Sequence, residues 1–125
     1  MANEDLIAEW PVEEIPGFDY LFKRVHQKLF KPDGTIMTGA FRDREMSVDW
    51  SKYSTPEETH RREGNPEINA VVQMRAGDVR DVPGLSVVHA PVTANRAHSH
   101  ILGSKNEEAR VKLRRGAFIL LPLPA

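Results

Sequence analysis

The sequence predicts an α+β protein with one small sheet, mixed or mostly antiparallel, of about five or six strands and two short helices. Three observations predict this class. Short apolar or alternating segments recur between turn residues, and two segments carry the start and stop signals of a helix. The 125 residues suffice for one domain with a modest core.

We interpret residues 1–19 as an N-terminal arm and residues 20–125 as a single globular domain. The arm is acidic and carries scattered apolar side chains. Trp10 and Phe18 would be costly to leave in water, so we expect the arm to lie on the domain or on a neighbouring subunit. A loose tail is the alternative.

The first predicted strand is YLFKRVHQ, residues 20–27. Because side chains alternate between the two faces of a strand, one face is expected to carry Tyr20, Phe22, Arg24 and His26. The opposite face is expected to carry Leu21, Lys23 and Val25. Because both faces mix apolar and charged residues, we expect one face to be covered and the other to border a polar cavity or an edge. Further strands are expected at 46–50, 68–76, 85–92 and around 97–103. The apolar segment 117–124 is expected to form a last strand or an extended tail.

Two segments carry helix signals. In STPEETHRREGNP, residues 54–66, Thr55 is the expected N-cap, Pro56 the first helical residue and Glu58 the third, which closes a capping box. Gly64 is expected to end this helix. In SKNEEARVKLRR, residues 104–115, the expected N-cap is Ser104, and the order of acidic and then basic residues matches the helix dipole.

Composition excludes several classes of function. The 17 Lys and Arg residues nearly balance the 18 Asp and Glu residues, and a formal net charge of -1 gives no field that favours nucleic acid or an anionic membrane. The arginines are scattered, so no motif supports nucleic-acid binding. The absence of cysteine excludes disulfides, thiolate zinc sites and cysteine nucleophiles. The N-terminus is not a secretory signal and the C-terminal apolar run is too short to span a bilayer, so we expect a soluble, cytoplasmic protein without a membrane partner.

The segment ANRAHSHILGS, residues 94–104, holds the first candidate site. On a strand, His98 and His100 point to the same face, and their imidazoles could converge on one metal ion or one anion. A zinc or iron site needs a third ligand, which nothing in the spacing selects, so no metal site is predicted. Gly103 and Ser104 open the second expected helix, whose first N–H groups are natural phosphate donors. The alternatives are two structural histidines, a Gly103 that serves only the turn and a Ser104 that serves only the cap.

Arg24 and His26 form the second candidate, because they share a strand face and an unpartnered buried guanidinium is costly. An ion pair of Arg24 with an acidic residue of the adjacent strand is the alternative. Ser47 and Asp49 share a face of the next strand, but the nucleophile elbow G-x-S-x-G of serine hydrolases is missing. P-loop, dinucleotide-binding and metalloprotease motifs are missing as well. The sequence therefore assigns neither a cofactor nor a catalytic residue.

The chain resembles a set of small bacterial proteins of uncharacterised activity, over all but the N-terminal arm and the last apolar segment. The shared features are an R-[IV]-H strand, a D-G turn, an A-F pair, an S-V segment, a T-P-E-E helix start and a late A-H segment followed by G-x-K. Here these positions are Arg24, His26, Asp33, Gly34, Ala40, Phe41, Ser47, Val48, Thr55–Glu58, Pro91, Asn95 (displaced by one residue), Ala97, His98, Gly103 and Lys105. The resemblance singles out these residues for attention, but it implies no particular activity. An early Arg-bearing strand, a G-A-F segment and a strand with Ser that is followed by an acidic helix give a fainter resemblance to compact ADP-ribosyltransferase-type folds. The catalytic glutamate of such enzymes has no clear counterpart here, although Glu57 and Glu58 are nearby.

Two functions are compatible with these observations. In the first, the chain is a non-enzymatic accessory or partner-binding protein, expected to pair with itself as a homodimer or with another protein through its apolar ends, Trp10, Phe18 and 118–121. In the alternative, it binds or acts on a phosphate-bearing ligand such as a nucleotide, so the sequence leaves open whether it is an enzyme. The ligand-binding candidates are Arg24, His26, Ser47, His98, His100, Ser104 and Lys105. The alternative predicts that Arg24, His26 and His98 converge on one cavity.

Overall fold

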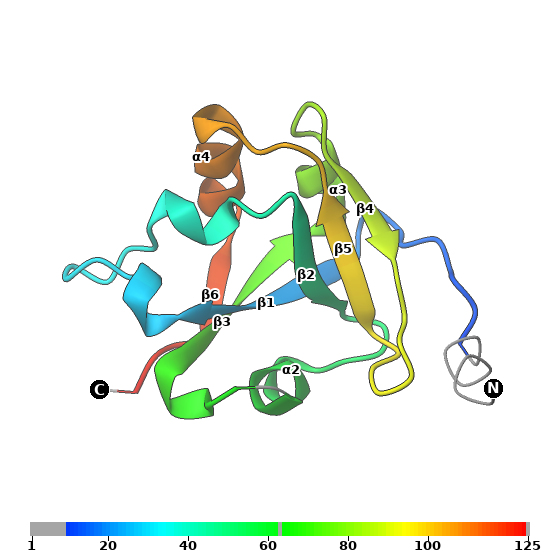
Figure 1. Ribbon diagram of the computed structural model, residues 1–125, viewed down its shortest axis with the longest axis horizontal. Helices are drawn as coiled ribbons and strands as arrows, with labels where there is room; N and C mark the ends of the chain where they lie inside the picture. Colours follow the sequence, from blue (N-terminus) through cyan, green and yellow to red (C-terminus); the bar gives the residue numbers. More distant parts are fainter. Residues whose placement is uncertain (1–9, 63, 125) are drawn as a thin grey trace.

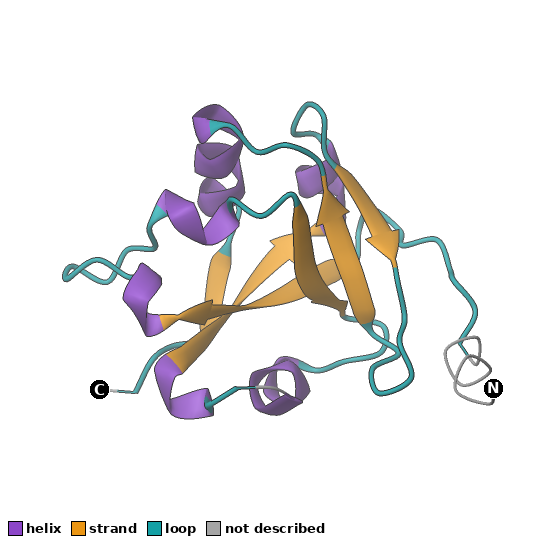
Figure 2. Cartoon of the chain, in the orientation of Figure 1, coloured by secondary structure: helices purple, strands orange, loops and turns teal. Residues whose placement is uncertain are grey.

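The structure is a computed structural model that describes residues 10–62 and 64–124. One antiparallel sheet of six strands, in the order β4-β5-β2-β1-β3-β6, forms its centre (Figure 1). The strands are β1 Tyr20–His26, β2 Glu45–Trp50, β3 Asn69–Arg75, β4 Ser86–His89, β5 His98–Leu102 and β6 Phe118–Leu121. The α-helices are α2 Pro56–Arg62, α3 Ala76–Arg80 and α4 Glu107–Arg115, and 3₁₀ helices span η1 Gln27–Leu29, η2 Thr38–Phe41 and η3 Pro66–Ile68 (Figure 2). The predicted α+β class is confirmed.

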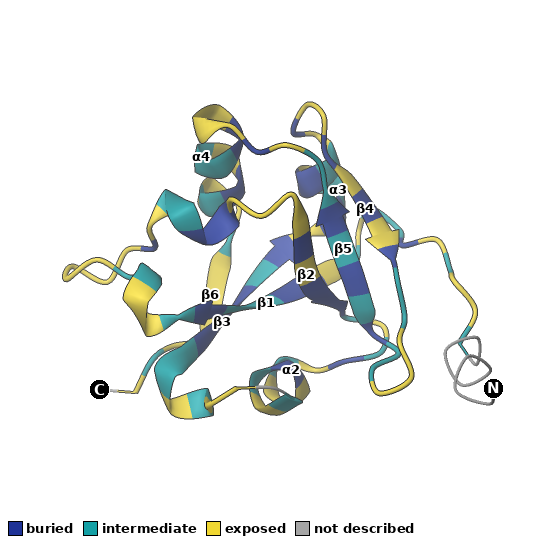
Figure 3. Cartoon of the chain, viewed as in Figure 1, coloured by how far each residue is buried: buried dark blue, intermediate teal, exposed yellow. Residues whose placement is uncertain are grey.

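The two faces of the sheet differ. The face that we call the core face carries apolar side chains from five strands and packs against α3, α4 and η2. Its buried members include Leu21, Val25, Met46, Val48, Trp50, Val72, Met74, Val87 and Ile101. The opposite face, which we call the second face, is covered by α2 over β1, β3 and β6. In Figure 1, α3 and α4 lie above the sheet and α2 lies below it. Buried and less buried residues alternate along β5, as the side-chain period of two requires (Figure 3).

The ladder between β1 and β2 is much shorter than its neighbours. β1 pairs with β3 along its whole length, from Tyr20 to His26, whereas it pairs with β2 only at Leu21 and Phe22. β2 in turn pairs with β5 from Glu45 to Asp49. Beyond Phe22, therefore, β1 and β2 part, and this separation leaves room for a pocket in the middle of the sheet.

The helix signals of the sequence are confirmed for α2 and corrected for α4. At α2, the N–H of Thr55 donates to Oε1 of Glu58 at 2.9 Å and the N–H of Glu58 donates to Oγ1 of Thr55 at 3.1 Å, which is the predicted capping box. At α4, Ser104 is not the N-cap. Asn106 caps the helix, because its Oδ1 accepts from the N–H of Ala109 at 2.8 Å. The reason lies in Lys105, whose buried ammonium bonds to carbonyl groups at the end of β5 and so keeps the preceding residues out of the helix.

The described part of the N-terminal arm, residues 10–19, lies on the domain. Ile15 is 1% exposed and belongs to the core. The carbonyl of Gly17 accepts from the N–H of Gly77 at 2.8 Å, and Oδ2 of Asp19 accepts from the indole of Trp50 at 2.9 Å. Phe18 is 70% exposed, although its size led us to expect cover. Residues 1–9 of the arm lie outside the described residues.

Candidate functional site

The parting of β1 from β2 opens a pocket of about 50 Å³ on the second face of the sheet. Residues from three strands and from the turn before β5 line it: Phe22, Arg24, Ser47, Val48, Asp49, Asn95 and His98. Arg24 and His98 are far apart in the sequence and come together here because β2, between them, pairs with β5 and leaves β1 early. We call this the split pocket.

Asp49 forms the floor of the split pocket and is 5% exposed. Its Oδ2 accepts hydrogen bonds from Oγ1 of Thr59, at 2.8 Å, and from Nη1 of Arg62. Its Oδ1 accepts from Nδ2 of Asn95 at 2.8 Å. The buried carboxylate therefore has one cationic and two neutral donors, which is the arrangement that offsets the cost of its desolvation.

Arg24 projects from β1 between the pocket and α2. Its Nη1 donates to the carbonyl of Thr59 at 2.7 Å, so the guanidinium is held at the pocket wall by the same helix turn that supports Asp49. A guanidinium carries five donors in a planar fork, so it can bond to the protein and to a ligand at the same time. Arg24 and Arg62 both lie near the carboxylate of Asp49, and Arg62 forms an ion pair with it.

His98 presents a defined ring nitrogen to the second face. Its Nδ1 lies 2.9 Å from the carbonyl of Ala90, and because a carbonyl only accepts, Nδ1 carries the hydrogen. Nε2 of the neutral ring is then an acceptor, and it becomes a donor when the imidazole is protonated. The ring of His100 lies with its centroid 4.8 Å from that of His98 and at 84° to it, so the prediction that both share one face is confirmed.

His100 and Ser47 extend the site across the sheet. They are directly opposed on β5 and β2, and Ser47 is exposed. Burial lowers the pKa of His100, and the neighbouring His98 lowers it further, so the second imidazole stays neutral at neutral pH. Among the described residues no group of three or more His, Asp or Glu side chains is placed to hold a metal ion, and the two imidazoles alone do not complete a zinc site.

The other candidate residues lie elsewhere. His26 is at the far end of β1, where its Nδ1 accepts from the N–H of Lys28 at 3.0 Å and caps η1. Lys105 is 4% exposed, and its Nζ donates to the carbonyls of Arg44, Ile101 and Gly103. Burial lowers the pKa of Lys105. These residues do not line the split pocket, and neither does Ser104, which is exposed in the loop before α4.

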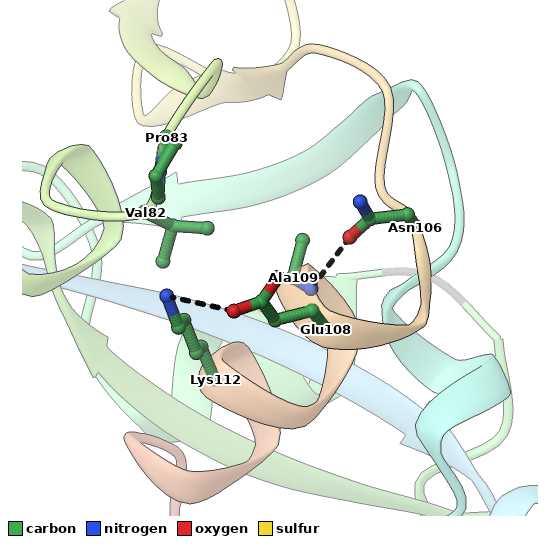
Figure 4. A pocket seen from close by; sticks show the side chains of 6 residues that line it. All are labelled: Val82, Pro83, Asn106, Glu108, Ala109 and Lys112. Atoms are coloured by element: carbon green, nitrogen blue, oxygen red, sulfur yellow. Dashed lines mark hydrogen bonds and ion pairs between the residues drawn. The ribbon is translucent and has the colours of Figure 1, made fainter.

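A second hollow, of about 80 Å³, lies beside the start of α4, close to where the sequence suggested a phosphate site (Figure 4). Its polar side chains are paired with groups of their own helix: Lys112 lies 3.6 Å from Oε2 of Glu108, and Asn106 accepts from the N–H of Ala109. The first turn of α4 also begins with Glu107 and Glu108, whose charges oppose an anion at the helix N-terminus. This hollow is therefore a poor anion site.

Asp49 and Thr59 are the functional candidates that sequence reasoning undervalues. The sequence presents Asp49 only as a partner for other residues, and it does not single out Thr59. No local signal marks them: Asp49 shares its strand face with the exposed Ser47, and Thr59 lies in a helix without apolar periodicity. Identification of the network therefore requires the packing of α2 on the sheet.

Comparison with protein-family models, with curated proteins and with solved structures finds no match to this chain. Within the described residues, no helix combines the length and the apolar character needed to cross a membrane. The function is therefore inferred from the chemistry of the site itself.

Proposed function

We propose that the protein binds a phosphate-bearing ligand, with its phosphoryl group in the split pocket. The observation that carries this proposal is the convergence of Arg24, Ser47 and His98, from three different strands, on one small polar pocket. A guanidinium and a hydroxyl are donors that recur in phosphate recognition, and the imidazole of His98 joins them as a donor through Nε2 in its protonated form. Asp49 does not repel the anion strongly, because Arg62 and two neutral donors already hold its carboxylate.

The size of the pocket limits what enters it. A volume of about 50 Å³ accommodates a compact head group and not a whole metabolite. The remainder of the ligand would extend over the part of the second face that no described helix covers, past Ser47 and His100 towards β4. α2 covers only the other half of this face. The accessory, partner-binding role expected from the sequence would use a different surface, because a protein segment does not fit this pocket.

The experiment that tests the proposal is a histidine NMR titration with inorganic phosphate, at constant ionic strength maintained with chloride. In the wild-type chain we expect saturable shifts of the His98 ring signals. In Arg24→Gln we expect a dissociation constant at least about tenfold weaker, since a charge-assisted hydrogen bond contributes about 1.5–3 kcal/mol. The matched control is Arg61→Gln, which removes an exposed arginine of α2 and should leave the titration unchanged.

Two results would contradict the proposal. One is the absence of any saturable shift at His98. The other is an equal weakening in the Arg24 and Arg61 variants, which would show that phosphate responds only to overall charge. A parallel titration with a phosphomonoester then reports whether the rest of the ligand adds affinity over the second face.

A further inference from the structure

Strand β6 lies at one edge of the sheet and leaves apolar side chains in solvent. It pairs with β3 on one side, and no strand of the described residues pairs with its other side. Phe118 is 72% exposed, Ile119 42% and Leu120 38% (Figure 3). A strand without charged residues and with an open backbone edge is a template for pairing with another strand.

The opposite edge of the sheet, β4, is covered by the chain itself. The N–H of Glu13 donates to Nδ1 of His89 at 3.0 Å, and Nη2 of Arg80 donates to the carbonyl of Val87 at 3.2 Å. The described chain begins at Trp10, whose indole donates to the carbonyl of Thr93 at 3.4 Å on this side of the sheet (Figure 1). Among the described residues, no hydrogen bond of this kind reaches the outer edge of β6.

We infer that a second copy of this chain pairs with β6 across a two-fold axis. An isologous contact requires a self-complementary surface. In the two-fold antiparallel registers centred on Ile119 or on Leu120, the residues Phe118–Leu121 oppose one another or the flanking Ala117 or Pro122, so the pairing desolvates no charged side chain. The two sheets then join at β6, and the open backbone groups of each copy acquire partners.

The surroundings of β6 are self-complementary as well. A pocket of about 550 Å³ beside Ile119 is lined by Lys31 and Arg114 and also by Asp33, so each copy offers both signs of charge at the rim. A second pocket of about 270 Å³ next to the same strand is lined mainly by apolar residues: Phe30, Lys31, Pro32, Gly34, Ile119, Pro122 and Leu123. The apolar strand, the apolar pocket and the rim that carries both signs of charge together fit a second copy of the chain. They fit a partner whose surface carries charges of only one sign less well.

The first test is sedimentation velocity of the full chain over concentrations from about 5 µM to about 500 µM. A four-residue strand edge makes an interface smaller than the standard ~1,600 Å², so we expect a weak dimer that forms within this range. Phe118→Lys should keep the chain monomeric throughout, because it places two like charges in the interface. Val88→Lys, at an exposed apolar residue of β4, is the matched control and should dimerise as the wild type does.

The second test uses the absence of cysteine from the chain, which makes an introduced thiol unique. Ile119→Cys and Leu120→Cys place the thiol near the two-fold axis, and we expect at least one of them to form an intermolecular disulfide under mild oxidation. Val12→Cys, at a position that is 72% exposed on the other side of the sheet, should stay unlinked although its thiol is the more accessible. A wild-type chain that remains monomeric at every concentration would overturn the inference. The inference would also fail if Val12→Cys formed the intermolecular disulfide as readily as Ile119→Cys and Leu120→Cys. It would fail as well if Val88→Lys abolished the dimer to the same extent as Phe118→Lys.

Discussion

Nδ2 of Asn95 donates a 2.8 Å hydrogen bond to Oδ1 of Asp49 and so ties the turn before β5 to the buried end of β2. Oδ1 of the same asparagine accepts from the N–H of Ala97 at 3.0 Å, which holds the turn in shape. Through Thr59, Asp49 is also bound to α2. One buried carboxylate thus connects the elements that build the walls of the split pocket, and its loss should affect both stability and the site.

Asp49→Asn should lower the free energy of unfolding by roughly 2–4 kcal/mol. The amide removes the counter-charge of Arg62 and turns one acceptor into a donor that faces other donors. Urea denaturation followed by circular dichroism measures the change. Ser47→Ala, on the same face of β2 but exposed, is the control and should change stability by less than about 0.5 kcal/mol. Similar values for the two variants would contradict the role assigned to Asp49.

Gly103→Ala should be strongly destabilising, by at least about 2–3 kcal/mol. Gly103 has φ +126°, and an added Cβ would lie 2.3 Å from the carbonyl oxygen of Gly84, a backbone atom that cannot turn aside. Gly39→Ala provides the comparison, because a Cβ added there would meet no atom within 4 Å and the φ of Gly39 is not positive. Thermal unfolding of both variants distinguishes them, and a Gly103→Ala chain as stable as Gly39→Ala would show that the loop from 103 to 106 readjusts freely.

The sequence was sufficient for the class of fold, for the approximate positions of the first five strands and for the faces of β1, whereas it left the last segment open between a strand and an extended tail. The alternation of β1 correctly separates Leu21 and Val25 from Phe22 and Arg24, and the expectation of a polar cavity on one side agrees with the split pocket. The capping box of α2 was also predicted correctly, since it depends only on residues three positions apart.

What the sequence could not provide depends on long-range packing. The start of α4 was misplaced, because Ser104 and Asn106 are both good N-caps and only the burial of Lys105 between them selects the second. The early end of the β1–β2 ladder is another such feature, and it is what creates the pocket. Nothing in the local pattern of either strand indicates where two strands part.

His100 should titrate below its usual pKa of 6.5, because burial and then the neighbouring His98 disfavour the imidazolium. In His98→Asn, whose amide can still donate to the carbonyl of Ala90, the pKa of His100 should rise but stay below 6.5, since burial is the larger cause. Between the folded pKa and 6.5 the unfolded chain binds a proton that the folded chain does not, so stability falls as the pH drops through this window. A ring-signal titration measures both values. A full return to 6.5 in the variant would make the charge of His98, and not burial, the dominant cause.

Lys105 should give the protein a stability that grows with pH in the alkaline range. Burial lowers its pKa in the folded chain from 10.5, so between the folded pKa and 10.5 the unfolded chain retains a proton that the folded chain has released. The free energy of unfolding therefore rises with pH across this window. Lys105→Met removes this pH-dependent contribution to stability. In urea denaturation at a series of pH values, the free energy of unfolding of the variant relative to that of the wild type should therefore decline as the pH approaches 10.5. Lys28→Met, which removes an exposed lysine, should keep a constant difference from the wild type. A constant difference for Lys105→Met as well would mean that its three carbonyl acceptors hold the ammonium charged in the fold, against the effect of burial.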